Sequence, residues 1–133
     1  MRRLFQDYKR EEQEYFRRTG IFPISHVVTL RRDFVDAHPD APVALLEAFR
    51  RARDAAFDRL EGSDPQVLVI SWAAAAVEEQ RALMGEHYWP YNVEDNRHVL
   101  DAITQYAHEQ GLSPARIDYE DLFDRDAATL PGR

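Results

Sequence analysis

One β-like segment, Ile24–Leu30, constrains this sequence more than any other feature, because most of the remaining chain has helical patterns. The segment contains Val27, Val28 and Thr29, and β-branched residues favour a pleated, half-buried strand. A strand without a neighbour cannot satisfy its backbone N–H and C=O groups. We therefore expect this segment to pair either with a sheet that the chain does not encode or with a second copy of the chain.

The junction before this segment combines a glycine and a proline. We expect Gly20 to end a helix over residues 4–19 in the left-handed conformation, while Pro23 holds Phe22 in an extended one. His26 follows beside the apolar segment, a position that suits acid–base chemistry. The alternative, a core histidine hydrogen-bonded to the backbone, stays open.

Helical patterns occupy most of the remaining chain. Periodicity and capping residues predict helices over residues 4–19, 41–60, 71–84 and 93–110, with short helical stretches at 34–38 and 118–123. The expected N-caps of the later long helices are Asp40, Ser71 and Asn92. The face expected to be buried in the 93–110 helix consists of Val93, Asn96, Leu100, Ile103 and Ala107, flanked by Val99 and Tyr106. In the 41–60 helix, Arg53 interrupts an otherwise apolar face. The run Val67–Ile70 suits either a buried strand or the start of a helix.

Composition excludes several classes of protein. At 133 residues, with 44% hydrophobic residues, the chain has the size of one domain with a packed core. Its net charge is −7 and it has no basic stripe, so nucleic-acid binding is not expected. The lack of cysteine excludes disulfides and thiolate chemistry. The first residues are charged and no apolar run approaches the ~20 residues that cross a bilayer, so we expect a cytoplasmic protein without membrane insertion.

A loop at residues 85–92 has an unusual concentration of aromatic residues. Tyr88, Trp89 and Tyr91 surround Pro90, and their flat faces and polar groups suit an aromatic ligand. Packing of the loop onto the core is the alternative. On the following helix, we interpret Glu94 and His98 as an exposed ion pair, and His98 and His108 lie too far apart along that helix to share a metal ion.

Several motifs, in this order and spacing, resemble the C-terminal part of the 4,5-dihydroxyphthalate decarboxylase family. They extend over nearly the whole chain, from about Leu4 to Phe123. The matching residues are Arg18–His26, Arg31–Asp33, Met84–Gly85, Trp89–Tyr91, Glu94, Asn96–Arg97 and Glu109–Leu112. The chain departs from the family at Asn92, where we expect glycine, and in the apolar run before Ser71.

This resemblance implies a fold similar to that of type II periplasmic solute-binding proteins, with two α/β lobes around a ligand cleft. Only the C-terminal portion is represented here, so we expect a helix-rich α/β structure with few strands and an incomplete sheet. We expect residues 1–124 to form that portion and residues 125–133 to form a flexible tail. A missing N-terminal lobe or a second copy of the chain is the expected protein partner.

The resemblance also implies decarboxylation of a hydroxylated aromatic dicarboxylic acid. A hydroxyl para to the carboxylate accepts the electrons, so no organic cofactor is expected, and no metal-ligand set is present in the sequence. His26 is our candidate for a proton transfer, Arg18 for binding a carboxylate, and Trp89 and Tyr91 for packing on the ring. The candidate residues are His26 as catalytic and Arg18, Thr19, Gly20, Trp89 and Tyr91 as substrate-binding.

Two other functions remain open at this point. The first is a non-catalytic solute-binding protein of an ABC-type uptake system for aromatic or carboxylated ligands, which fold similarity alone supports weakly. The second is a chain without activity of its own, because much of the ligand cleft is missing.

Overall fold

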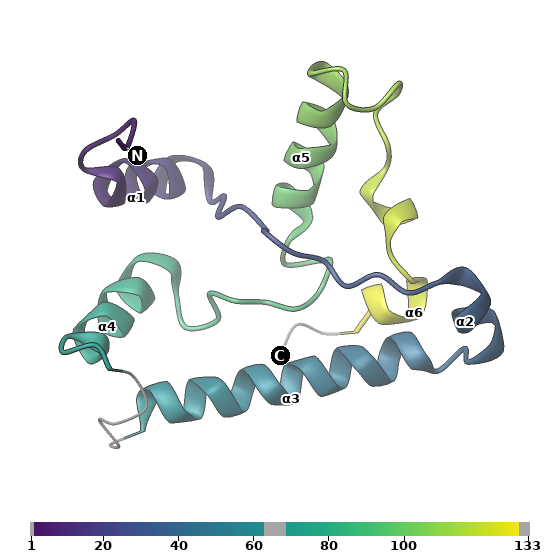
Figure 1. Cartoon of the computed structure of the whole chain (residues 1–133), viewed down its shortest axis with the longest axis horizontal. Helices are drawn as coiled ribbons and strands as arrows, with labels where there is room; N and C mark the ends of the chain where they lie inside the picture. Colours follow the sequence, from purple (N-terminus) through teal and green to yellow (C-terminus); the bar gives the residue numbers. More distant parts are fainter. Residues whose placement is uncertain (1, 63–68, 131–133) are drawn as a thin grey trace.

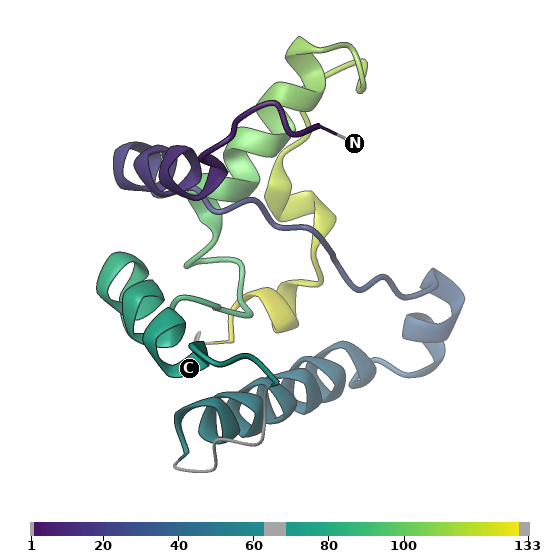
Figure 2. The same cartoon turned by 60° about the vertical axis from the view of Figure 1, so that its left-hand side comes forward.

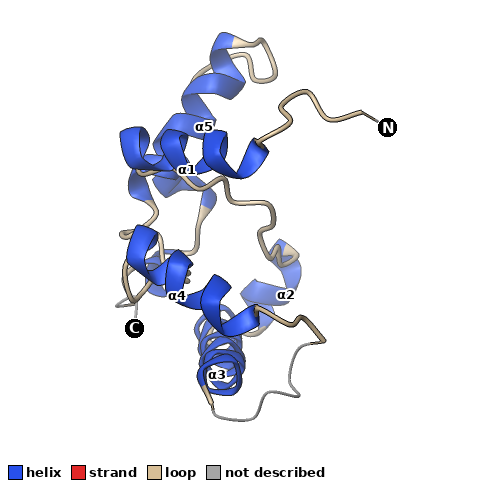
Figure 3. Cartoon of the chain, turned by 90° about the vertical axis from the view of Figure 1, so that its left-hand side faces the viewer, coloured by secondary structure: helices blue, strands red, loops and turns tan. Residues whose placement is uncertain are grey.

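Helices form all of the regular secondary structure in the part of the chain that the computed structural model describes, residues 2–62 and 69–130. Figure 1 shows their arrangement, and Figure 3 shows that these residues contain no strand. The elements are α1 (Tyr8–Thr19), α2 (Arg32–Ala37), α3 (Ala41–Glu61), α4 (Ala73–Met84), α5 (Arg97–Glu109), the 3-10 helix η1 (Tyr119–Leu122) and α6 (Arg125–Ala128). The helix-rich part of the fold prediction is therefore confirmed.

The longest helix, α3, has 21 residues and contacts both α4 and α6 (Figures 1 and 2). Pro42 lies in its first turn, where a missing N–H costs no intrahelical hydrogen bond, and it is buried. Asp40 occupies the N-cap position as predicted, although its side chain makes no capping hydrogen bond. The predicted bounds, 41–60, differ from the observed ones by one residue.

Helix α1 ends as its sequence predicts. Gly20 has φ 68°, and its N–H donates to the carbonyl of Phe16 at 2.7 Å. The helix begins at Tyr8, later than residue 4, because Asp7 is the N-cap and its carboxylate accepts from the N–H of Arg10.

The strand predicted at Ile24–Leu30 is wrong. Residues 20–31 contain no helix or strand, and Val27 and Val28 are exposed. The described residues offer no second strand, so the segment has nothing with which to form a ladder. In the other ambiguous run, residues 67 and 68 lie outside the described residues, while Val69 and Ile70 are irregular and exposed.

Two further helices begin later than expected. Trp72 stands at the N-cap position of α4, and Ser71 does not cap it. Asn92 makes a turn of its own, in which its Oδ1 accepts from the N–H of Asp95 at 3.1 Å, and α5 begins only after Asn96. A side chain that can cap a helix can equally form such a turn, and this explains the displaced start.

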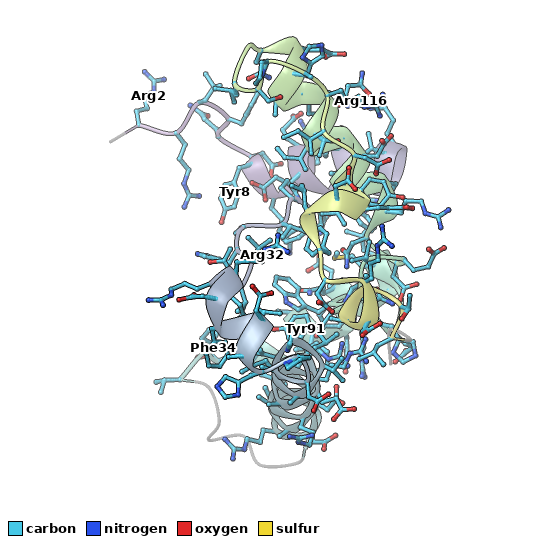
Figure 4. The ribbon with its side chains drawn as sticks, turned by 90° about the vertical axis from the view of Figure 1, so that its right-hand side faces the viewer. Arg2, Tyr8, Arg32, Phe34, Tyr91 and Arg116 are labelled. Carbon is cyan, nitrogen blue, oxygen red and sulfur yellow. The ribbon has the colours of Figure 1, made fainter. Side chains whose placement is uncertain are left out.

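The small buried core lies on α5. Val99, Leu100 and Thr104 are the buried residues of this helix. The predicted face was correct for Leu100 but rotated, since Val99 is buried while Ile103 is 58% exposed. Many large hydrophobic side chains on other elements are exposed, and the stick view in Figure 4 shows how openly the helices are arranged. No described helix is both long enough and apolar enough to span a membrane.

The segment predicted as a flexible tail contains α6. Asp124 caps this short helix by accepting from the N–H of Ala127 at 3.0 Å, and α6 contacts α3. The predicted boundary between residues 1–124 and 125–133 stays a prediction.

Candidate functional site

The turn at Thr19 and Gly20 closes α1 and carries part of the predicted site. Thr19 Oγ1 donates to the carbonyl of Tyr15 at 2.8 Å and accepts from the N–H of Ile21 at 3.1 Å. The positive φ of Gly20 is one that glycine adopts without steric cost. His98 Nε2 donates to the carbonyl of Gly20 at 2.8 Å. The turn is therefore fixed both by its own helix and by α5.

The loop with Trp89, Pro90 and Tyr91 carries the second part, and α5 holds it too. Asn96 Nδ2 donates to the carbonyl of Pro90 at 3.0 Å and to that of Asn92 at 2.8 Å. Two hydrogen bonds from one amide fix the path of the loop immediately before α5 begins.

Two arginines of α3 hold the same loop from the other side. Arg50 Nη2 donates to the carbonyls of Tyr91 and Leu130, each at 3.2 Å. Arg53 Nη1 donates to the carbonyl of Trp89, also at 3.2 Å. A spacing of three places both side chains on one face of α3. The interruption of that apolar face by Arg53 was the sequence signal for this contact.

Arg53 also packs against the aromatic ring of Tyr91. Its guanidinium carbon lies 5.3 Å from the centroid of the Tyr91 ring, within cation–π range, and Figure 4 shows Tyr91 close to α3. The Arg53 side chain is only 8% exposed and pairs with Asp54 at 2.7 Å. A hollow of about 40 Å³ lies here, lined by Arg53, Asp54, Phe57, His87, Trp89 and Pro90. Because Arg53 already has these partners, it helps to form the side of this hollow and does not offer an unpaired cation to a ligand.

A ring contact joins the two parts of the predicted site. The rings of Phe22 and Trp89 lie 5.8 Å apart, centroid to centroid, at 55° to each other. The start of α5 reinforces this contact, since Asn96 holds the loop and His98 holds the turn. The structure thus brings the segments of Gly20 and Trp89 together.

Arg18 and His26 are not part of this cluster. Arg18 is exposed, and its guanidinium lies 5.7 Å from the centroid of the Tyr15 ring. His26 is exposed and makes no hydrogen bond, ion pair or ring contact within the part of the chain that the structure describes. Among the described residues, neither has a hydrogen bond, ion pair or ring contact with Trp89 or Tyr91. The roles of all the candidate residues stay predictions.

The expected Glu94–His98 ion pair is wrong, because each residue has another partner. Glu94 pairs with Arg97 at 2.5 Å, and this hydrogen bond raises the pKa of Arg97 above its usual value. His98 instead reaches the carbonyl of Gly20. Among the described residues, no group of His, Cys, Asp and Glu side chains is placed to hold a metal ion.

Sequence reasoning missed most of the residues that hold the site. Phe22 was interpreted only as the residue before a proline, and Arg50 gave no signal beyond its place in a helix. Asn96 was expected on the buried face of its helix, which agrees with its half-buried position, but its contact with the loop was not foreseen.

Comparison with known proteins gives one relationship that covers most of the chain. No family model matches the sequence. Over 120 residues, which are 90% of this chain, it is 31% identical to the 4,5-dihydroxyphthalate decarboxylase of Comamonas testosteroni. The matched region is 36% of that relative, so the chain spans little more than a third of its length. The resemblance indicated by the motifs is thereby confirmed: the chain is related in sequence to the 4,5-dihydroxyphthalate decarboxylases.

Proposed function

We propose that this chain supplies part of the binding site for a hydroxylated aromatic dicarboxylate in a decarboxylase of the 4,5-dihydroxyphthalate type. The observation that carries the proposal is the contact between the rings of Phe22 and Trp89, which come from two separate segments. Tyr91 lies on the same loop as Trp89 against Arg53, and Phe22 follows the turn at Gly20 that His98 holds. Together with the sequence relationship, this cluster favours a flat aromatic ligand. The activity belongs to the proposal, because the chain spans only 36% of the relative.

The proposal includes the architecture around the site. Residues 1–124 would form the C-terminal portion of a type II periplasmic-binding-protein-like fold, in which the ligand lies between two lobes. The open arrangement of the described helices and their exposed hydrophobic side chains support a structure that further polypeptide completes.

The residues divide the work of binding. Trp89 and Tyr91 would pack against the ring of the ligand, while Arg53 fixes the Tyr91 ring in place. Arg18 is the candidate for a carboxylate of the ligand, because its guanidinium has no carboxylate partner within the described residues. The Thr19 and Gly20 turn would hold Arg18 at the end of α1.

The proposed reaction uses only proton transfers. A base removes the proton of the hydroxyl para to the departing carboxylate, and an acid protonates the ring carbon that bears this carboxylate. The resulting dienone expels carbon dioxide, and the electrons of the broken bond restore the ring as a phenolate, which is then protonated. His26 is the candidate for one of these transfers.

The proposal can be tested by replacing the matched region of the Comamonas testosteroni decarboxylase with this chain. We expect the graft to release carbon dioxide from 4,5-dihydroxyphthalate, and His26→Ala to lower the rate by about 100-fold, as the loss of a general acid or base does. His38→Ala, at the end of α2, is the matched control and should retain the rate of the graft.

Each other outcome has a definite meaning. Full activity of His26→Ala would remove His26 from the chemistry. A folded graft that binds 4,5-dihydroxyphthalate without releasing carbon dioxide would favour the solute-binding function. A folded graft that neither binds nor reacts would overturn the proposal.

A further inference from the structure

Arg50 is a half-buried arginine of α3 that has no carboxylate partner among the described residues. Two neighbouring arginines of the same helix each have one. Arg51 pairs with Glu47 at 4.0 Å, and Arg53 pairs with Asp54 at 2.7 Å. Removing a charge from water costs free energy unless an opposite charge or good hydrogen bonds compensate it. The charge of Arg50 therefore needs a partner that its own helix does not supply.

The hydrogen bonds of Arg50 use only one of its three side-chain nitrogens. Nη2 donates to the carbonyls of Tyr91 and Leu130, each at 3.2 Å, and these bonds occupy both of its N–H groups. Nε is buried and has no hydrogen-bond partner in the part of the chain that the structure describes. Nη1 likewise makes no hydrogen bond to a described residue. Buried donors without a partner are rare in folded proteins, so this guanidinium is suited to a further acceptor.

The position of Arg50 indicates which acceptor this is. Its bond to the carbonyl of Tyr91 places the guanidinium against the loop whose aromatic residues are the candidates for packing on the ring of the ligand. Three residues along α3, Arg53 holds the same loop through the carbonyl of Trp89. An anion bound at Arg50 would therefore lie beside this loop.

We propose that Arg50 binds a carboxylate of the ligand through Nη1, as the second cation that a dicarboxylate requires beside Arg18. The inference rests on the proposed function, because it names how the same site recognises the charge of its ligand. A hydrogen bond between a guanidinium and a carboxylate is charge-assisted and about twice as strong as a neutral one. The two carbonyls already fix the guanidinium, so little side-chain freedom is lost when the ligand binds.

A purely structural role for Arg50 makes a different prediction. If Arg50 only ties the loop to the carbonyl of Leu130, its loss disturbs the loop and weakens every ligand equally. If Arg50 binds a carboxylate, its loss weakens only ligands that carry the negative charge. A charged ligand and a neutral one of the same shape therefore separate the two roles.

The test titrates the full chain with 4,5-dihydroxyphthalate and with its neutral diamide, which keeps the ring and both hydroxyls. Side-chain NMR detects weak binding at the Nε–H groups of arginines, and the Arg50 signal is the one that Arg50→Lys removes. We expect this signal to move with the dicarboxylate and to stay in place with the diamide. High salt should weaken the response to the dicarboxylate.

Variants measure the contribution of Arg50 to affinity, followed through the amide signals of Trp89 and Tyr91. Arg50→Gln should weaken binding of 4,5-dihydroxyphthalate at least about tenfold, as the loss of a hydrogen bond between charged groups does, and leave the diamide unaffected. Arg50→Lys keeps the charge but not the planar fork, and should restore part of the affinity. Arg51→Gln is the matched control on α3 and should change neither ligand, because Arg51 is exposed and pairs with Glu47. All three variants should keep the helical circular dichroism of the chain.

Several results would overturn the inference. These are an equal loss for both ligands in Arg50→Gln, an Arg50 signal that stays in place with the dicarboxylate, or an equal loss in Arg51→Gln. The release of carbon dioxide by the graft is a separate measurement. An active graft with unchanged affinity in Arg50→Gln would reject this inference alone, whereas an inactive graft beside a chain that binds the dicarboxylate through Arg50 would reject the proposed catalysis alone.

Discussion

Helix α5 and the segment of residues 21–31, called the crossing segment, are both rich in apolar residues, but only α5 has apolar side chains that other parts of the chain bury. Val99 and Leu100 are buried, and Asn96 and His98 hold two other segments from the start of the same helix. In the crossing segment, by contrast, Val28 is 64% exposed. Figure 2 shows α5 among neighbouring elements, while the crossing segment runs apart from the helices over much of its length.

In this chain, apolar residues therefore stabilise a defined arrangement only where another element covers them. A helix satisfies its backbone groups without help, so α5 needs neighbours only for its side chains. An extended segment needs a neighbour for its backbone as well. The described residues cover part of the apolar side chains of α5, but they give the backbone groups of residues 22–30 in the crossing segment no hydrogen-bond partner.

The largest expected effect tests this comparison directly. Leu100→Ala should lower the free energy of unfolding by about 2–3 kcal/mol, because it removes a buried side chain and leaves a cavity. Val28→Ala in the crossing segment should change it by less than about 0.5 kcal/mol, as exposed substitutions do. Urea denaturation followed by circular dichroism measures both.

Ile103→Ala is the control within α5 itself, since Ile103 is 58% exposed and shares the helix with Leu100. It should cost less than about 0.5 kcal/mol. Equal losses for Leu100→Ala and Val28→Ala would break the comparison, because they would show that the crossing segment is covered in solution.

The helices could be predicted from the sequence because their signals are local. Pro42 marks the first turn of α3, and Gly20 ends α1 in the conformation that its residue type favours. The strand at Ile24–Leu30 failed because strand formation depends on a partner that local sequence does not describe. The predicted start of α5 was wrong because an asparagine such as Asn92 can either cap a helix or form a turn, and here it forms a turn.

The candidate site could be predicted in part. The closeness of the Gly20 and Trp89 segments follows from contacts between residues far apart in the sequence, above all His98 with Gly20 and Phe22 with Trp89. No periodicity encodes such contacts. The sequence singled out Arg53 as an interruption of the apolar face of α3, but it did not indicate that Arg53 bonds to the carbonyl of Trp89.

A smaller effect is expected where α5 holds the aromatic loop. Asn96→Ala removes two hydrogen bonds to loop carbonyls and should cost about 1–2 kcal/mol. In a Trp72→Phe background, where Trp89 is the remaining tryptophan, its fluorescence should also move toward that of a solvated indole.

Gln105→Ala provides the comparison for this loss. Gln105 also lies on α5, but among the described residues its amide bonds only to Glu109 on the same helix. Its substitution should leave the fluorescence of Trp89 unchanged. A matching change in the two variants would mean that Asn96 supports the helix rather than the loop.

The smallest effect concerns α1 and α4, which are joined by exposed polar contacts. Glu79 accepts from Lys9 Nζ at 2.5 Å and from Gln13 Nε2 at 2.9 Å, and these bonds lower its pKa below the usual 4.5. A lowered pKa stabilises the folded state above the unfolded pKa, and this stabilisation is lost as the pH falls through the folded value.

We therefore expect the contact between α1 and α4 to weaken below about pH 4.5, measured by amide exchange in α1, and to weaken also in high salt. Glu79→Gln should abolish this pH dependence, whereas Glu78→Gln, at the neighbouring exposed position, should retain it. A pH dependence that survives Glu79→Gln would show that α1 is held by apolar contacts, as α5 is. That result would group α1 with α5, whose apolar side chains are covered, rather than leave it intermediate between α5 and the crossing segment.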